Sequence, residues 1–356
     1  MGDQQPNHYP LVAISVLNWN GWRDTIQCLE STRQLDYPNY ITIVVDNGSS
    51  NGSAERIKEW ARESLGPGCA IAEYHDDSAL RGGEQEGEAE LERVPCANRL
   101  VLIRNRVNKG LSGGHNVAIR YALTRKPMAD DVFILNNDVA VCSDSLTRLL
   151  SVQRSSNAGI VGASVTLKES PQLRFETPAS FRASFFAPFV RDWAQPAVSE
   201  KPYLNTDFVI GTAMLIGRDV LTEIGGSSGE YFCSDLFFSG PESFCFAAKL
   251  RGYSSVIATG PAVEHLGGRS GGRTGSTLRY YYDERDLVLR ARMMLPFHYR
   301  MLFYMLNLSR ATGSMAKNLL RRRPRAAWAM LQGVLDGYRG RGGKWKYHDQ
   351  EAPARG

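Results

Sequence analysis

The sequence predicts an α/β fold in which helices flank a mostly parallel, doubly wound central sheet. Short apolar, β-rich runs alternate with helical segments along the first part of the chain. Several of these runs end abruptly in polar residues, which is typical of parallel strands that carry a ligand site at their carboxyl ends. The chain has 356 residues, enough for one large domain with appendages.

Four apolar runs define the expected parallel strands, with helices between them. A helix should follow the first run, because Asp36-Tyr37-Pro38 can end it. A glycine-rich loop and a second helix should follow the third run. The expected strands are Leu11–Leu17, Ile41–Val45, Arg99–Ile103 and Val132–Leu135; the helices are Gly21–Gln34 and one that ends at Leu123, after a loop from Asn108 to Gly114.

Residues 66–98 interrupt this alternation. Eight acidic and two basic side chains lie between Glu73 and Arg93, and the stretch is rich in glycine. We expect an acidic surface insertion with little regular structure, and a poorly ordered loop without a role is the alternative.

The pattern becomes mixed beyond Gly159. Expected elements are strands Phe208–Ile216 and Ser255–Ala258, a helix from Arg218 to Glu223, and an amphipathic helix Leu278–Met294. The last sixty residues are basic, amphipathic and helical in pattern. We therefore expect a polar tail over residues 1–9, a main α/β domain over 10–294 and a basic helical region over 295–356.

Charge is concentrated near the carboxyl terminus. The formal net charge is +5, and between Lys317 and Lys346 nine basic residues are opposed only by Asp336. This favours peripheral contact with an anionic membrane over nucleic-acid binding. No apolar run reaches the roughly 18 residues of a membrane span, the first ten residues do not resemble a signal peptide, and the six cysteines lack CxxC spacing. We expect a cytoplasmic protein at the inner face of the cell membrane.

Two carboxylates follow expected strands. Asp138 closes the segment Asn136-Asn137-Asp138, and Asp46 begins Asp46-Asn47-Gly48. A carboxylate at a strand end can ligate Mg²⁺ that bridges two phosphates, and it can also accept from a base N–H or a ribose hydroxyl. Both segments are equally good turn sequences, so neither is specific by itself.

Four polar motifs occur in a fixed order. They are Asn18-Trp19-Asn20-Gly21, Asp46-Asn47-Gly48-Ser49-Ser50, the segment from Asn108 to Asn116, and Leu135-Asn136-Asn137-Asp138. This ordered set resembles the family 2 glycosyltransferases of GT-A fold, especially their rhamnosyltransferase-like branch. Later segments also fit the family, namely Gly211–Ile216, His265 with Gly267, Gly268 and Ser270, Tyr281-Tyr282 with Arg285, and Gly333–Gly340.

The resemblance implies inverting transfer of a sugar from a nucleotide-diphosphate donor, such as dTDP-rhamnose or a UDP-sugar, to a lipid-linked or cell-envelope saccharide acceptor. Asp138 would ligate Mg²⁺ or Mn²⁺. His265 would add a metal or diphosphate contact, although a single histidine near glycines is more often a structural hydrogen-bonding residue. The resemblance assigns the nucleotide-sugar contacts to Leu17, Asn18, Asn20, Asp46, Asn108, Gly113, Gly114, Asn116 and Asn137.

The sequence departs from the family at the general base. The family places an aspartate just before a helix. Here Ser243 occupies that position if the segment is aligned from Phe237-Phe238, and the position shifts by two residues if it is aligned from Cys245. Glu242 is the carboxylate next to Ser243, and Asp235 is the second candidate; either can accept a proton if it reaches the acceptor hydroxyl. His115 and Asp286 each replace a usual asparagine.

Two other functions remain open. Ser243 favours a catalytically inactive homologue that still binds a sugar nucleotide. A nicotinamide-dependent oxidoreductase is disfavoured, because Leu17-Asn18-Trp19-Asn20-Gly21 lacks the G-x-G-x-x-G pattern with which a pyrophosphate approaches the first helix.

Overall fold

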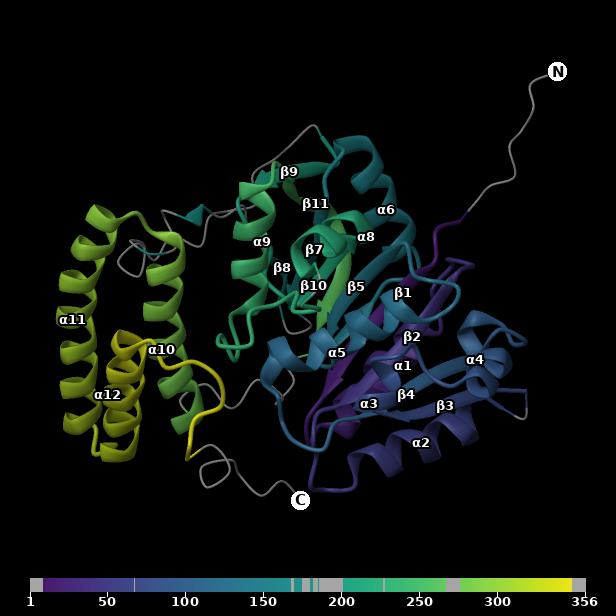
Figure 1. Cartoon of the computed structure of the whole chain (residues 1–356), viewed down its shortest axis with the longest axis horizontal. Coiled ribbons are helices and arrows are strands. Elements are labelled where there is room, and N and C mark those ends of the chain that lie inside the picture. Colours follow the sequence, from purple (N-terminus) through teal and green to yellow (C-terminus); the bar gives the residue numbers. More distant parts are fainter. Residues whose placement is uncertain are drawn as a thin grey trace.

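The computed structural model describes residues 9–66, 68–167, 170–174, 180–181, 185, 201–226, 228–266 and 276–347. Figure 1 shows two parts, a central sheet flanked by helices and a group of three helices, α10, α11 and α12, at one side. Of the expected polar tail over 1–9, residues 1–8 lie outside the described ranges.

Five strands form the parallel part of the sheet in the order β3-β4-β2-β1-β5. They are β1 (Val12–Asn18), β2 (Tyr40–Asp46), β3 (Ala70–His75), β4 (Arg99–Arg104) and β5 (Asp131–Asn136). The predicted α/β fold with a mostly parallel sheet is confirmed. The register places Asn18 beside Asp46 and Leu17 beside Asn136, so the polar strand ends meet at one edge.

The sheet continues beyond β5 with mixed pairing. β10 (Ala213–Gly217) runs antiparallel to both β5 and β7 (Ile160–Leu167), and β11 (Ser255–His265) runs parallel to β7. Three short strands complete it: β6 (Val139–Val141) and β9 (Tyr203–Thr206) pair with β11, and β8 (Ser170–Arg174) pairs with β7. The β6–β11 pair positions part of the candidate site.

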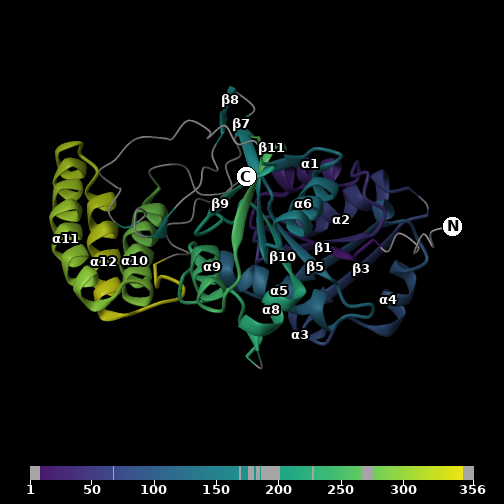
Figure 2. The same cartoon turned by 90° about the horizontal axis from the view of Figure 1, so that it is seen from above.

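Alternating strand residues bury both faces of the sheet. On one face, Val12, Ile14 and Val16 pack with α1 (Trp22–Thr32), α2 (Ser53–Ser64) and α6 (Ser145–Ser156). On the other, Ala13 and Ile43 pack with α5 (Gly110–Thr124), α8 (Arg218–Gly225) and α9 (Gly240–Leu250). Figure 2 shows these helices around the sheet from a second direction.

Residues 66–98 correct our expectation of little regular structure. They form the edge strand β3, two short helices, α3 (Asp76–Ala79) and α4 (Gln85–Leu91), and a 3₁₀ turn, η1 (Cys96–Asn98). Buried and partly exposed residues alternate along this strand, with Ala70, Ala72 and Tyr74 buried. The acidic residues around the strand concealed this alternation in the sequence. Some of those acids have a structural role, because Glu88 and Glu92 pair with the fully buried Arg125 at 3.0 and 2.6 Å.

Three further boundaries differ from expectation. Helix α5 begins at Gly110, so most of the expected glycine-rich loop is helical. The expected strand Phe208–Ile216 forms only from Ala213, and β11 extends to His265 because it pairs with β6 and β7 there.

The carboxyl-terminal part is a three-helix group of α10 (Thr277–Met294), α11 (Phe297–Leu320) and α12 (Pro324–Arg339). Two glycines allow α12 to approach α10 closely: a Cβ at Gly333 would lie 2.3 Å from the Tyr281 carbonyl oxygen, and one at Gly337 would lie 2.8 Å from Val288. Within the described ranges, no helix has the length and apolar character needed to cross a membrane.

Candidate active site

The ends of β1 and β2 hold the Asp46 carboxylate in a fixed orientation. Asn18 Nδ2 donates to Asp46 Oδ1 at 2.6 Å, and Ser49 Oγ donates to the same oxygen at 2.5 Å. The Ser49 backbone N–H lies 3.3 Å from Oδ2. Asp46 is only 4% exposed, so the strand register and the turn after β2 together orient this acceptor at the sheet edge.

Asn18 and Asn137 are joined through a residue that sequence reasoning missed. Thr25 Oγ1 donates to Asn18 Oδ1 at 2.9 Å, and Asn137 Nδ2 donates to Thr25 Oγ1 at 2.9 Å. The Gly21 backbone N–H also donates to Asn18 Oδ1, at 3.2 Å. Both asparagines are buried, and these bonds connect the ends of β1 and β5 to the start of α1. Thr25 gave no sequence signal beyond its place one turn after Gly21.

Asn47 is a second residue that sequence reasoning treated only as part of a turn. Its Nδ2 donates to Asn108 Oδ1 and to the Gly110 carbonyl, both at 3.0 Å. Its Oδ1 accepts from Asn105 Nδ2 at 3.0 Å and from the Lys109 backbone N–H at 3.1 Å. Asn47 is 1% exposed, and it ties the end of β2 to the loop that begins α5.

Two glycines let α5 pack closely, Gly114 against β1 and Gly113 against the residue before the helix. A Cβ at Gly114 would lie 2.3 Å from Leu17 Cδ1, and one at Gly113 would lie 2.7 Å from Lys109 Cβ. Asn116 forms a reciprocal pair with the Phe232 backbone, donating and accepting at 2.8 Å. The structure therefore gives these three residues packing and anchoring contacts, and their contact with a donor stays a prediction.

Asn20 and His115 have distinct local roles. Asn20 has a positive φ of 55°, and its Oδ1 accepts from the Ser50 backbone N–H at 2.9 Å, so it fixes the turn after β1 against the turn after β2. His115 is fully buried, with Nδ1 2.8 Å from Ser15 Oγ. Burial lowers the pKa of His115 to about 3, so its ring is neutral within the core.

Asp138 and His265 lie together because β6 pairs with β11. The register places Val139 opposite His265, and His265 Nε2 is 3.6 Å from Asp138 Oδ2. The Leu266 backbone N–H also donates to the Asp138 carbonyl at 2.9 Å. The neighbouring residues Gly267, Gly268 and Ser270 lie outside the described residues. One carboxylate and one imidazole thus converge at the sheet edge.

This pair fits a divalent ion that a diphosphate helps to bind. No group of three or more His, Cys, Asp or Glu side chains in the described part of the chain could hold an ion. Mg²⁺ commonly takes one or two carboxylates and completes its shell with phosphate oxygens and water. The thiol of nearby Cys28 is a poor further ligand, because burial, and secondarily the charge of Asp138, raise its pKa.

The two candidate bases lie in different places, one on helix α9 and the other in the loop before it. Glu242 lies in its first turn, with Oε1 3.5 Å from Arg290 Nη1 of α10, and both side chains are 17% exposed. Asp235 is exposed in the loop before the helix. Ser243, at the family's base position, is buried and donates to the Gly240 carbonyl at 2.7 Å. Glu242 is thus the carboxylate on the helix itself.

The loop before α9 is attached to the start of α5. Ser112 Oγ donates to the Leu236 carbonyl at 2.5 Å, and the Leu111 backbone N–H donates to the Phe237 carbonyl at 2.9 Å. On its other side, Phe238 N–H donates to Asp286 at 3.1 Å. The end of β2, the start of α5 and the α9 loop therefore form one continuous bonded unit.

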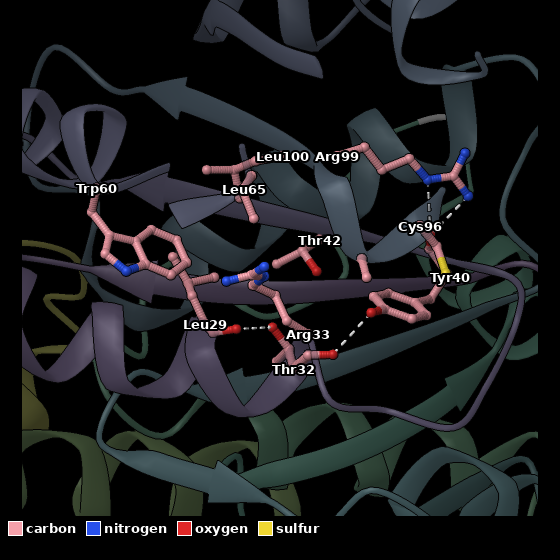
Figure 3. Close-up of a pocket in the computed structure, with 11 residues that line it drawn as sticks. Leu29, Thr32, Arg33, Tyr40, Thr42, Trp60, Leu65, Cys96, Arg99 and Leu100 are labelled. Carbon is pink, nitrogen blue, oxygen red and sulfur yellow. Dashed lines mark hydrogen bonds between the residues drawn. The ribbon is translucent and has the colours of Figure 1, made fainter. Parts of the chain in front are cut away.

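Figure 3 shows a cavity that is separate from this unit. Its volume is about 10 Å³, and its lining includes Arg33, Tyr40 and Thr42. Tyr40 begins β2, whereas Asp46 ends it. Such a cavity has room for about one water, so it is not a sugar-nucleotide site.

Comparison with known proteins relates the chain to glycosyltransferases. It is 28% identical over 145 residues to the low-salt glycan biosynthesis hexosyltransferase Agl10 of Haloferax volcanii. That match covers 40% of this chain and 44% of the relative, so the chain is matched over less than half of the relative's length. No family model matches the chain.

Two solved structures share the fold. One is the mannosyltransferase PcManGT from Pyrobaculum calidifontis in complex with GDP-Man and Mn²⁺, with a TM-score of 0.54, 14% identity, and coverage of 94% of this chain and 91% of that one. The other is residues 1–349 of S. aureus TarS in complex with UDP-GlcNAc, with a TM-score of 0.51, 12% identity, and coverage of 91% and 81%. The α/β architecture is thus that of known glycosyltransferase structures.

Proposed function

We propose that the protein is a glycosyltransferase that uses a nucleoside-diphosphate sugar and a divalent metal ion. One observation carries the proposal: the carboxylates of Asp46 and Asp138 lie at the carboxyl-end edge of the sheet, where Asn18 fixes the first at 2.6 Å and His265 lies 3.6 Å from the second. The partial match to a hexosyltransferase and the shared fold support it.

Each end of this edge would take a different part of the donor. Asp46, held by Asn18 and Ser49, would accept from the nucleoside base or the ribose. Asp138 and His265 would hold Mg²⁺ or Mn²⁺, which when bound supplies Lewis-acid neutralisation of the leaving diphosphate. Asn18, Asn137 and Asn47 would act as positioning residues, since their amides are used within the protein.

Glu242 would be the general base. Its carboxylate would take the proton of the acceptor hydroxyl as that oxygen bonds to the anomeric carbon, while the bond from that carbon to the diphosphate oxygen breaks. Attack opposite the leaving group inverts the anomeric centre. Asp235 is the weaker candidate, because its side chain lies in the exposed loop before α9 rather than on the helix.

For the donor and the acceptor we propose classes of compound rather than single compounds. The two structural neighbours contain GDP-Man and UDP-GlcNAc, so the shared fold accommodates more than one base. For this chain we propose dTDP-rhamnose or a UDP-sugar as donor, and a lipid-linked or cell-envelope saccharide as acceptor, in keeping with the rhamnosyltransferase-like motifs.

A binding and hydrolysis screen tests the proposal. Thermal shift and calorimetry with UDP-, GDP- and dTDP-sugars, each with Mg²⁺, Mn²⁺ or a chelator, should show metal-dependent binding of one donor class and slow release of its nucleoside diphosphate. Absence of binding to every donor with either ion would refute it. Binding without hydrolysis, and without transfer to any saccharide supplied, would establish the inactive homologue, which the buried, backbone-bonded Ser243 favours.

The oxidoreductase alternative has no comparable support. In such folds, the N–H groups at the start of the first helix bind a pyrophosphate. Here the Gly21 backbone N–H already donates to Asn18 Oδ1 at 3.2 Å.

A further inference from the structure

Helix α11 has its apolar side turned away from the protein. The residues buried against α10 and α12 are Phe303, Asn307, Ala311 and Asn318, most of which are polar or small. The residues on the opposite side are large and apolar, with exposures of 45% for Met301, 43% for Leu302, 65% for Met305, 54% for Leu308, 57% for Leu319 and 86% for Leu320. A helix on the surface of a water-soluble domain normally has the reverse arrangement.

The polar inward side makes side-chain hydrogen bonds within α11 and to its neighbours. Arg310 of α11 pairs with Glu284 of α10, and it also donates to Asn307 Oδ1 at 2.8 Å. Asn318 Nδ2 donates to the Ser314 carbonyl at 2.9 Å. The Arg310–Glu284 pair, together with the bond from Tyr338 Oη of α12 to the Tyr304 carbonyl at 3.0 Å, fixes the rotation of α11 against its neighbours, so the outward apolar side is a consequence of specific packing.

The outward side forms an apolar stripe, which the exposed residues Thr312 and Ala316 interrupt between Leu308 and Leu319. Met301, Met305 and Leu308 follow each other at spacings of four and three, which places them on one face of the helix. Leu319 lies close to the same direction, and the 24 residues of α11 span about 36 Å. In both Figure 1 and Figure 2, α11 is the helix farthest from the sheet, so the stripe lies at the outer edge of the molecule.

The charges around the stripe are all positive. From Leu287 to Leu335 the sequence contains nine lysines and arginines and no acidic residue. Arg321, Arg322, Arg323 and Arg325 are exposed directly after α11. A second copy of this chain would bring the same exposed arginines to the interface, whereas an anionic lipid surface neutralises them.

We propose that the outward stripe of α11 inserts into the interface of a bilayer rich in anionic lipids, with Arg321–Arg325 contacting the headgroups. A helix of this kind lies in the plane of the membrane and does not span it. The prediction of membrane contact through the basic charge between Lys317 and Lys346 is thereby changed, because α12 uses one side to pack on α10 and the larger exposed apolar side belongs to α11.

Vesicle co-sedimentation of the full chain tests the stripe. The native protein should bind phosphatidylglycerol-containing vesicles and bind pure phosphatidylcholine vesicles much more weakly. Met305→Glu should lower the partition coefficient at least tenfold, because it removes an apolar side chain from the interface and adds a repelled charge. Leu250→Glu is the matched control, because Leu250 is also exposed, at 72%, but lies at the end of α9. This variant should bind anionic vesicles as tightly as the native protein does.

Replacing Arg321 and Arg323 by glutamine tests the electrostatic part. Binding should fall about fivefold per arginine, equivalent to about 1 kcal/mol each, and the loss should shrink at high salt. These substitutions avoid truncating the basic tail, which would remove α12 from its packing on α10 and mix folding with binding.

Three results would overturn the proposal. They are equal binding to anionic and neutral vesicles, native binding by Met305→Glu, and a stable dimer in lipid-free buffer that Met305→Glu dissociates. Sugar-nucleotide binding in solution should be native in every variant. The vesicle assay needs no donor, so failure of this proposal and failure of the proposed transferase activity are distinguishable.

Discussion

At the donor end of the site, Asn18 and Ser49 hold the Asp46 carboxylate at 2.6 and 2.5 Å, whereas at α9 the Glu242 carboxylate has an ion-pair contact of 3.5 Å with Arg290. The first carboxylate is nearly buried, and the second lies on a helix that faces another helix. Under the roles proposed for these carboxylates, nucleotide recognition would be preorganised by strand ends, while the base would reach its working position through a longer side chain.

The largest expected effect is the loss of sugar transfer when Glu242 is replaced. Glu242→Gln keeps the shape of the side chain and removes the proton acceptor, so sugar transfer should fall about 10²–10⁴-fold. Donor and metal binding should be native, because neither needs this carboxylate. Steady-state transfer rates and calorimetric donor affinity measure the two quantities separately.

Two further variants test whether the loss of transfer is specific to the Glu242 carboxylate. Asp235→Asn should reduce transfer less than Glu242→Gln. Ser243→Asp restores the family's residue in the same turn, and it should raise the rate if the site has only lost its usual base. A native rate in Glu242→Gln would exclude Glu242 as the base.

The next effect concerns the rigidity of the donor end. Asn47→Ala leaves Asn105 Nδ2 and the Lys109 N–H without their buried acceptor, which should lower the free energy of unfolding by about 3 kcal/mol. Urea denaturation measures this change. Asn39→Ala is the matched control, because Asn39 donates one exposed bond, of 2.8 Å to the Tyr9 carbonyl, and its loss should cost below about 1 kcal/mol. Equal destabilisation by both changes would contradict the central role of Asn47.

A smaller effect should distinguish nucleoside from sugar recognition. Asp46→Ala should weaken binding of the free nucleoside diphosphate and of the full donor by the same factor, on the order of tenfold for one charge-assisted hydrogen bond. Calorimetry with both ligands gives the two factors. A loss confined to the full donor would instead place Asp46 against the sugar.

A further effect lies outside the candidate site, at the other end of β5, where Asp131 is buried beside Gln153. Burial raises the pKa of Asp131 to about 6 from its usual 3.8. The folded state therefore binds this proton more tightly than the unfolded state, and stability should fall as pH rises from about 4 to 6. Asp131→Asn should remove this fall, worth about 3 kcal/mol, in urea denaturation at stepped pH. An unchanged pH profile would contradict the assignment.

Much of the donor end could be predicted from sequence because it depends on strand ends. The apolar runs before Asn18, Asp46 and Asn136 locate three strands, and parallel pairing then brings their ends to one edge. The roles of Thr25 and Asn47 could not be predicted, because each depends on side-chain bonds to residues on other elements.

Other features were hidden by competing signals. The period of two in β3 is flanked by acidic residues, some of which pair with Arg125, a partner far along the chain. The pairing of Asp138 with His265 depends on the β6–β11 ladder, which joins strands more than a hundred residues apart in the sequence. The outward apolar side of α11 becomes visible only when its rotation is known.

The most direct test of the proposed metal site measures donor affinity with and without Mn²⁺ in the native protein and in Asp138→Asn. Asparagine keeps the size of the side chain and removes the charge that would hold the ion. If Asp138 holds the ion, Mn²⁺ should strengthen donor binding to the native protein by about tenfold or more, and Asp138→Asn should lose this gain while its metal-free affinity stays native. Equal affinity with and without Mn²⁺ in the native protein, or a full Mn²⁺ effect in Asp138→Asn, would contradict the proposed metal site.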